Sequence, residues 1–159
     1  MAVLGIDPGL ARTGYGVVAE AGGRLRALAY GCISTDASQQ TCVRLEAIFR
    51  EMSAVIAQHA PHSVAMEQLF AHVNAGSAMA AGEARGVAML AARLAGLEVD
   101  EFAPNQIKQA VTGYGRADKQ SVQKMICLLL GLDGPVRPAD ASDALAIAIC
   151  GLHRKGTMA

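Results

Sequence analysis

Residues 2–35 have the sequence AVLGIDPGLARTGYGVVAEAGGRLRALAYGCIST, a largely apolar stretch that two groups of turn-forming residues divide into three parts. Residues 2–7 form a short apolar run that stops at Asp-Pro-Gly, which predicts a buried strand. Residues 14–19 predict a second strand, and Gly22-Gly23 predicts a hairpin turn into a third strand over 24–35. Strands joined without an intervening helix pair antiparallel, so we expect the sheet to begin with antiparallel pairing.

Downstream of this region the apolar side chains recur at helical spacing. They predict a helix over 42–59 with an inner face of Leu45, Ile48, Phe49, Met52, Val55 and Ile56. Residues 63–67 and 97–102 predict two more strands, separated by an Ala-rich helix over 74–94. Three further helices are predicted over 104–112, over 119–130 with Asp118 as its cap, and over 139–153 with Pro138 near its first turn. This order predicts a single α/β domain over residues 1–159, with a mixed five-stranded sheet flanked by helices.

The composition limits the classes of protein to consider. The chain has 159 residues, 52% of them apolar, and it lacks the run of about 18 uncharged apolar residues that spans a membrane. The N-terminus lacks the basic segment and long apolar stretch of a signal peptide, so we expect a cytoplasmic protein. No CxxC spacing supports a zinc site, and we expect reduced core thiols at Cys32, Cys42, Cys127 and Cys150.

Four carboxylates stand where predicted elements begin or end. Asp7 closes the first strand and Glu67 closes the fourth. Asp140 and Asp143 lie three residues apart at the start of the last helix, where they share one helix face and the positive end of the helix dipole. If the first and fourth strands are neighbours, Asp7 and Glu67 meet at one edge of the sheet. The last helix then need only cross that edge to bring all four carboxylates together.

Such a cluster of carboxylates repels itself, and a divalent cation compensates for the repulsion. Ligands that are all oxygen favour Mg²⁺ or Mn²⁺ over zinc. Two such ions about 4 Å apart activate a water molecule and stabilise the leaving oxygen in phosphodiester hydrolysis. The four acids together therefore predict a metal-dependent hydrolase site that holds two ions.

Each acid also has an ordinary structural explanation. Asp7 fits a turn aspartate in Asp-Pro-Gly, and Asp140 and Asp143 fit the acids that are common in the first turn of a helix. Glu67 fits such an explanation less well, because an apolar strand seldom ends in an unpaired carboxylate. Residues 5–14 also resemble the phosphate-binding loop of actin-like sugar kinases and chaperone ATPases, but those proteins enclose a nucleotide between two such domains.

The charge distribution bears on DNA binding, which the net charge of zero does not favour by itself. Residues 1–103 carry seven basic and ten acidic side chains, whereas residues 104–159 carry seven basic and four acidic ones. If cations neutralise the four acids, the remaining side chains sum to +4. Binding depends on a local basic patch, so near-neutrality does not exclude a nuclease.

Four blocks of the sequence resemble the RuvC family of Holliday-junction resolvases. In order they are Leu4-Gly-Ile-Asp-Pro-Gly with Thr13-Gly-Tyr-Gly-Val; Glu67-Gln-Leu-Phe with Asn74, Ser77-Ala and Ala84-Arg-Gly; Phe102-Ala-Pro with Ile107-Lys, Val111, Gly113, Gly115, Ala117-Asp-Lys and Val122; and Asp140-Ala-Ser-Asp-Ala-Leu-Ala-Ile-Ala. They span nearly the whole chain without a large gap. The resemblance implies a ribonuclease-H-like fold, and it implies that the catalytic and metal-binding acids are Asp7, Glu67, Asp140 and Asp143.

The resemblance also implies the activity and the partners. A homodimer binds four-way junction DNA, and each subunit nicks one of two strands of like polarity, leaving ends that ligase can seal. Association with the RuvA–RuvB branch-migration complex is implied in the same way. Among the matching positions, Phe70 is expected to stack on bases opened at the crossover, and Lys108 and Lys119 are expected near the scissile phosphate or the DNA backbone. Structural alternatives are a core phenylalanine and solvated lysines. Location alone adds three residues to the basic patch, Arg116, Lys124 and Arg12.

The helix over 74–94 is the candidate dimer contact. Small and flexible residues form a stripe along it, at Ala75, Ala78, Met79, Gly82, Gly86, Met89 and Leu90. The same stripe suits packing on the subunit's own sheet, and the spacing leaves both alternatives open.

Two other functions are compatible with the same residues. A catalytically silent junction-binding protein of this fold would use the acids for structure, and a nuclease of this fold acting on RNA–DNA hybrids would use them for catalysis. Junction resolution is the leading hypothesis, because all four acids match the family in kind and position. The preferred cleavage sequence does not follow from the sequence, and neither does the choice between Mg²⁺ and Mn²⁺.

Overall fold

The computed structural model describes residues 1–69 and 74–156 of the chain. The elements in chain order are β1 (Ala2–Asp7), β2 (Arg12–Ala21), β3 (Arg24–Ser34), α1 (Thr41–His59), β4 (Ser63–Glu67), α2 (Ala75–Leu94), β5 (Val99–Phe102), α3 (Pro104–Thr112), α4 (Lys119–Leu130) and α5 (Ala139–Gly156). The predicted α/β class and the mixed five-stranded sheet are confirmed.

The strands form one sheet in the order β3-β2-β1-β4-β5. Strands β1, β2 and β3 pair antiparallel, as their direct succession predicts, and β4 and β5 continue the sheet in parallel on the other side of β1. Because β1 and β4 are parallel neighbours, with Ile6 opposite Met66, the strands end side by side at Asp7 and Glu67. The predicted meeting of these two strand ends at one edge of the sheet is therefore confirmed.

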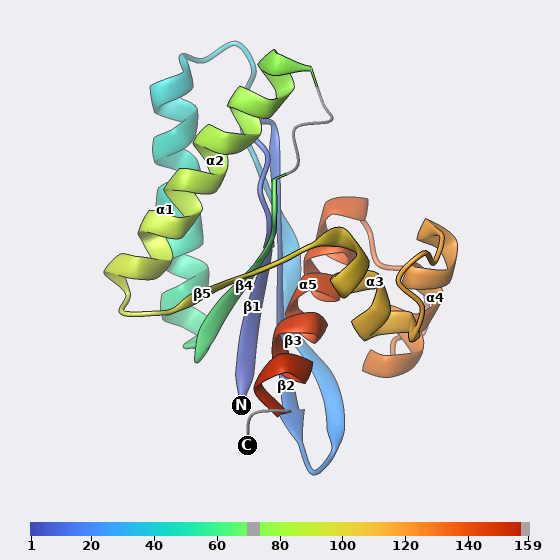
Figure 1. Cartoon of the computed structure of the whole chain (residues 1–159). Helices are drawn as coiled ribbons and strands as arrows, with labels where there is room; N and C mark the ends of the chain where they lie inside the picture. The colour runs from blue at the N-terminus through green and yellow to red at the C-terminus, as the bar shows by residue number, and fades with distance from the viewer. Residues whose placement is uncertain (70–73, 157–159) are drawn as a thin grey trace.

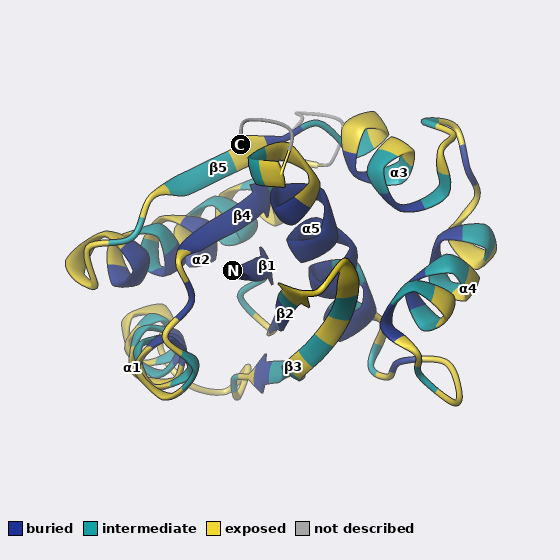
Figure 2. Cartoon of the chain, turned by 90° about the horizontal axis from the view of Figure 1, so that it is seen from below, coloured by how far each residue is buried: buried dark blue, intermediate teal, exposed yellow. Residues whose placement is uncertain are grey.

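Helices cover both faces of the sheet (Figures 1 and 2). Helices α1 and α2 lie on one face, where Ile48 and Met52 of α1 pack with Leu4 of β1. Helix α5 crosses the other face, and α3 and α4 pack beyond it around a second core that includes Leu145 and Ile149. The apolar sides of α1, α2 and α5 are buried toward the sheet, and that of α3 is buried against α5. None of the described helices is long and apolar enough to cross a membrane.

Glycines in β1 and β2 allow α5 to lie directly on the sheet. A Cβ atom at Gly5 would overlap the Ala144 carbonyl, and one at Gly14 would overlap the Asp140 carbonyl. Gly14 is also the register partner of Asp7. Since no side chain stands between the two backbones, the first turn of α5 is held against the end of β1.

Several element boundaries differ from the predicted ones by a few residues. Strand β2 extends beyond the predicted range of 14–19, because it pairs with β3 along its whole length. Strand β5 is shorter than the predicted 97–102, because Leu97 still belongs to the turn after α2, where its N–H donates to the Ala92 carbonyl. The predicted cap of α4 is confirmed, since Asp118 Oδ1 accepts a hydrogen bond from the Ser121 N–H at 2.8 Å.

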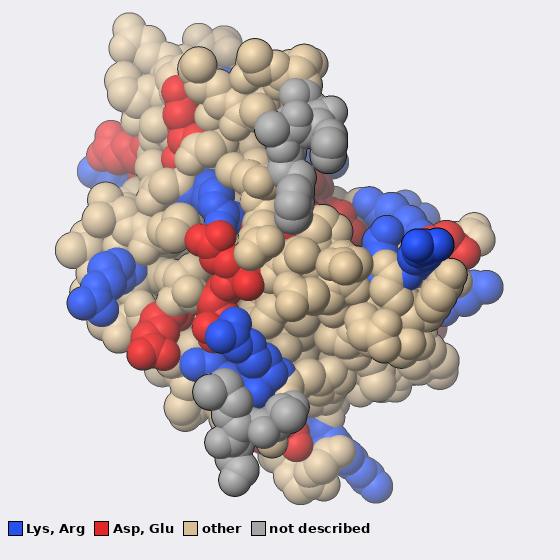
Figure 3. All heavy atoms as spheres, in the orientation of Figure 1, with Lys and Arg blue, Asp and Glu red and all other residues tan. Residues whose placement is uncertain are grey.

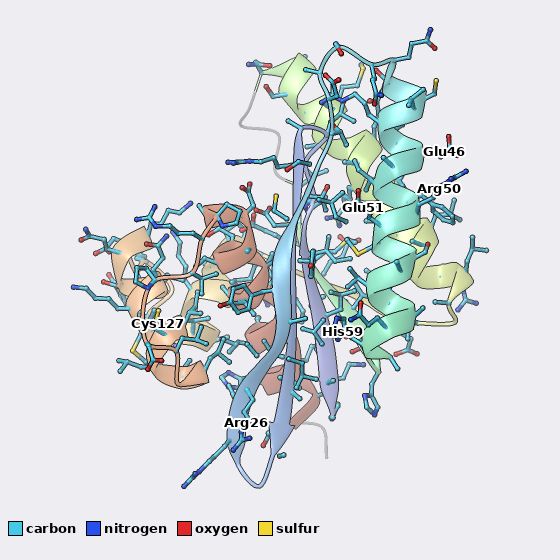
Figure 4. All side chains as sticks on the ribbon, turned by 180° about the vertical axis from the view of Figure 1, so that it is seen from behind. Arg26, Glu46, Arg50, Glu51, His59 and Cys127 are labelled. Atoms are coloured by element: carbon cyan, nitrogen blue, oxygen red, sulfur yellow. The ribbon has the colours of Figure 1, made fainter. Side chains whose placement is uncertain are left out.

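The prediction that the cysteines are core thiols is wrong for part of the set. Cys150 is buried, but Cys42 is exposed in the first turn of α1. Cys127 lies on α4, well away from the sheet (Figure 4), and its Sγ donates to the Gly134 carbonyl at 3.3 Å. A cysteine is small enough to occupy an amphipathic helix on either side, so its residue type alone did not fix its burial.

Candidate active site

Three of the four predicted acids line one cavity. Asp7 and Glu67 stand at the ends of the adjacent strands β1 and β4, and Asp143 projects from the first turns of α5. The cavity has a volume of about 260 Å³, and its lining also includes Lys108 of α3 and Lys119 of α4. The edge of the sheet, α5 and the α3–α4 pair thus bring together side chains that are far apart in the sequence.

The fourth acid, Asp140, lies beside this cavity rather than in its lining. Its backbone rests on Gly14, and its Oδ2 is 3.1 Å from Nη2 of Arg12. That distance makes an ion pair, but the approach of the two groups is not that of a hydrogen bond, and the buried Oδ2 has no hydrogen-bond partner among the described residues. One carboxylate oxygen of Asp140 is therefore incompletely satisfied.

The electrostatics of Asp7 connect it to the three other acids. Burial raises the pKa of Asp7 to about 7, and the negative charges of Asp143, Asp140 and Glu67 contribute to this rise, while Lys119 opposes it. Carboxylates that approach one another in a poorly solvated place cannot all ionise without a compensating cation. Asp140 therefore acts electrostatically on Asp7, although it lies outside the cavity lining.

The pKa of Glu67 is also raised, and fewer neighbouring acids contribute to the rise. Burial raises its pKa, Asp143 raises it further, and Lys108 lowers it. Two lysines thus face the acids from the α3–α4 side, because Lys119 Nζ also donates a hydrogen bond to Asp143 Oδ2 at 3.2 Å. The site combines excess negative charge at the sheet edge with positive charge opposite, which suits a phosphate held between cations.

Basic side chains continue beyond the cavity. Figure 3 shows that Lys and Arg side chains gather over α3 and α4, with acidic side chains beside them. Arg116 is exposed in the turn between these two helices, and it lines a separate hollow together with Asn105 and Tyr114. The structure therefore does not bring Arg116 to the acids. Phe70, predicted to contact DNA, lies outside the described residues.

Two buried residues support the acids, although the sequence analysis quoted them only as parts of the family blocks and assigned them no role. Thr13 closes the loop after Asp7, because its hydroxyl donates to the Gly9 carbonyl at 2.8 Å and accepts from the Gly9 N–H at 3.3 Å. Arg85 of α2 reaches the backbone carbonyl of Glu67. The available signals were a polar residue within an apolar strand and an arginine on an alanine-rich helix face.

The donor set fits a hard divalent cation in its chemistry. All four groups are carboxylates, Asp7 is destabilised in its charged form, and Asp140 has an unsatisfied buried oxygen. As arranged, however, the described residues contain no group of three His, Cys, Asp or Glu side chains positioned to hold an ion. Two of the acids are instead turned toward the protein's own cations, Arg12 and Lys119.

Comparison with known proteins identifies the family. The family model described as crossover junction endodeoxyribonuclease RuvC matches residues 3–151. The chain belongs to the RuvC family. The RuvC crossover junction endodeoxyribonuclease of Heliobacterium modesticaldum is 51% identical over 153 residues, which cover 96% of this chain and 94% of that protein. The RuvC of Syntrophomonas wolfei is 46% identical over 153 residues, covering 96% of this chain and 89% of that protein.

Solved structures agree with this assignment. Thermus thermophilus RuvC in complex with a Holliday junction substrate matches with a TM-score of 0.93 and 36% identity, over 99% of this chain and 97% of that one. The yeast mitochondrial Holliday junction resolvase, at 13% identity and a TM-score of 0.71, shares the fold. The resemblance to RuvC and the ribonuclease-H-like fold, both predicted from the four sequence blocks, are confirmed.

Proposed function

We propose that this chain is a divalent-metal-dependent endonuclease that resolves Holliday junctions by paired symmetric nicks, in DNA recombination and repair. The observation that carries the proposal is the convergence of Asp7, Glu67 and Asp143 on one cavity, with Asp140 close enough to raise the pKa of Asp7. The RuvC family supports it, because the relatives are named crossover junction endodeoxyribonucleases. We also propose, on the family resemblance, that the protein binds divalent metal ions, forms a homodimer and contacts junction DNA.

The residues that would hold two Mg²⁺ or Mn²⁺ ions per subunit are Asp7, Glu67, Asp140 and Asp143. When bound, such ions activate water and stabilise the leaving oxygen of the phosphodiester. Arg12 and Lys119 pair with Asp140 and Asp143 in the described arrangement, and they would be available to bind DNA phosphates if metal ions took over those carboxylates. Lys108 and Lys119 line the cavity opposite the acids, where they would neutralise the charge that develops on the phosphate.

A homodimer is the assembly that two paired nicks require, and α2 offers the contact. Met79 is 68% exposed and Leu90 is 52% exposed, and an added Cβ at Gly86 would meet open space. The inner side of the same helix is buried and consists of Ala84, Arg85, Ala88, Ala91 and Ala92. The alternative that the stripe packs on the subunit's own sheet is therefore wrong for its exposed members. A second copy, which presents the same stripe, is the occupant that a two-fold axis provides.

Three further roles stay predictions: those of Phe70 and of the branch-migration complex rest on family resemblance, and that of Arg116 rests on its location alone. Phe70 is proposed to stack on an opened base, and Arg116 is proposed to bind the DNA backbone outside the catalytic cavity. Association with the RuvA–RuvB branch-migration complex is proposed without an assigned surface.

The test is cleavage of a labelled synthetic four-way junction by the wild type and by Asp7→Asn, with Mg²⁺, with Mn²⁺ and with chelator. We expect paired, symmetric, ligatable nicks from the wild type with metal and none from Asp7→Asn, which removes a ligand charge at constant shape. Junction affinity of the variant should be retained or improved, because a negative charge beside the DNA is lost.

The same experiment separates the alternatives. Tight junction binding without nicks under every metal condition would favour the catalytically silent junction-binding protein. Equal loss of binding and cutting in Asp7→Asn would indicate a structural role for this acid. Preference for an RNA–DNA hybrid competitor would favour a nuclease of this fold that acts on RNA–DNA hybrids.

A further inference from the structure

We propose that Arg85 is a positioning residue that fixes Glu67 at the edge of the active-site cavity by tying it to helix α2. The side chain of Arg85 is 10% exposed, and buried charges of this kind are kept only where they have partners. Both ends of its guanidinium are engaged. Nη1 donates to the backbone carbonyl of Glu67 at 2.5 Å, and Nη2 lies 2.8 Å from Oε2 of Glu101 on β5.

The contact is made at the end of β4, where the pairing with β1 has stopped while the pairing with β5 still joins Glu67 and Phe102. Glu67 lies one residue beyond the last register pair between β4 and β1, which joins Met66 and Ile6. A carbonyl at that point needs another donor, and Arg85 supplies it. Strand pairing on both sides of Met66 holds the chain before Glu67, and Arg85 holds the planar peptide group that follows it, so the two together restrict the direction in which the Glu67 side chain leaves the backbone. Arg85 thus controls the aim of a carboxylate that it does not touch.

An arginine suits this task better than a lysine. Its two acceptors belong to different strands, β4 and β5, and a planar guanidinium holds both with separate nitrogens. A lysine would keep the charge but offers one nitrogen, so it would hold either Glu67 or Glu101 less firmly. The conservative substitution Arg85→Lys therefore removes the positioning while it keeps the buried cation.

The Arg85 side chain extends from helix α2, which is therefore the element that anchors the end of β4. Arg85 stands between buried Ala84 and exposed Gly86, at the border between the inner face of α2 and its exposed stripe. The helix that offers the dimer contact thus also holds the strand end that carries Glu67. This role rests on the proposed function, because it matters for catalysis only if Glu67 binds metal.

The experiment compares Arg85→Lys with the wild type in metal binding, junction binding and cleavage. Mn²⁺ binding to the DNA-free protein, measured by calorimetry and electron paramagnetic resonance, is the readout that does not depend on activity. Loss of an outer partner of a metal ligand typically weakens metal affinity or activity by roughly 10- to 100-fold, and we expect a loss of that order in Mn²⁺ affinity and in the single-turnover rate. Junction affinity and thermal stability should stay close to the wild-type values. Arg93→Lys is the matched control, since Arg93 is exposed in the last turn of α2, and it should change none of these quantities.

Several outcomes would overturn the role of Arg85. A folded Arg85→Lys protein with wild-type Mn²⁺ affinity and cleavage rate would do so, as would a parallel loss of stability, junction binding and metal binding that indicates a merely structural residue. If Arg85→Lys does not fold, Glu101→Gln tests the same contact from the other side. It should weaken Mn²⁺ binding to a smaller extent, and unchanged Mn²⁺ binding would count against the role. A wild type that neither binds Mn²⁺ nor cuts junctions would instead refute the proposed function.

Discussion

At the scale of single residues, Asp7 sets the pH response of the site. Burial is the main reason that its pKa rises from 3.8 to about 7, with Asp143, Asp140 and Glu67 adding to the effect. The unfolded chain has the ordinary aspartate pKa. Between these two values the native state keeps a proton that the unfolded state releases, so the metal-free protein loses stability as the pH rises through this window.

Replacing Asp7 by Asn should therefore stabilise the metal-free protein in a pH-dependent manner. Asparagine resembles the protonated acid at every pH, so the gain in Tm should be small near pH 4, grow until about pH 7 and level off above it. Thermal melts of both proteins across this range in chelator would measure it. Added Mg²⁺ should reduce the difference, because it stabilises the ionised wild type and not the variant.

The control for this pH response is Asp36→Asn. Asp36 is exposed, and hydrogen bonds from the Ser38 backbone and hydroxyl lower its pKa. Its replacement should stabilise the protein at no pH. A gain in Tm for Asp7→Asn that is the same at pH 4 and pH 8 would show that burial and like charge do not govern Asp7.

At the scale of elements, the contact between β2 and α5 determines whether the acids meet. Gly14 is opposite Asp7 in the sheet and lies under the backbone of Asp140. A single missing side chain therefore sets the distance between the end of β1 and the start of α5. Propensity alone would disfavour glycine in a strand, so its presence here is explained by the close approach of the two backbones.

Gly14→Ala should separate these elements and disturb the site. Its Cβ would overlap the Asp140 carbonyl, which is backbone and cannot rotate away. Overpacking of this kind costs about 1–3 kcal/mol, and we expect a loss of that size in the free energy of unfolding, measured by urea titration. Junction cleavage should fall by more than the stability loss explains, since the protein would still be largely folded.

Gly134→Ala is the comparison for this substitution. Gly134 has open space around its missing side chain and no positive φ, so alanine there should leave stability and cleavage nearly unchanged. Equal behaviour of the two variants would mean that α5 adjusts without cost, and that Gly14 does not control the site.

At the scale of the whole molecule, helix α2, which carries the exposed stripe, lies on the opposite face of the sheet from α5 (Figure 1). Figure 4 shows that the neighbouring helix α1 instead turns charged side chains outward, including the ion pair between Glu46 and Arg50 at 2.6 Å. The exposed stripe of α2, with Met79 and Leu90, is the part that a second subunit would cover.

Leu90→Glu should convert the proposed dimer to a monomer, because a two-fold contact would bring two unpaired charges into an apolar interface. Light scattering after size-exclusion chromatography would give the mass. The monomer should retain its fold and lose the paired nicks on a junction. Leu128→Glu, at a leucine that is 75% exposed on α4, should leave the mass unchanged. A wild type that is monomeric with and without junction DNA would refute the two-subunit mechanism itself.

Local sequence patterns were sufficient to predict most of the strands and helices of this protein. Apolar periodicity and turn residues predicted the strands and helices, because those signals act over a few neighbouring residues. The direct succession of three strands predicted their antiparallel pairing, and the family blocks predicted the ribonuclease-H-like fold. The four acids were found because their residue type and their positions at element ends are both visible in the sequence.

Only the tertiary structure decided which side chains share a space. It brought Asp7, Glu67 and Asp143 to one cavity, left Arg116 in another hollow, and turned Asp140 toward Arg12. It also revealed that Arg85, one of the two arginines of α2, reaches the carbonyl of Glu67. These contacts join segments that are distant along the chain, and they depend on the direction of each side chain and on the close approach of backbones. Neither quantity is contained in the spacing of residues within a single element.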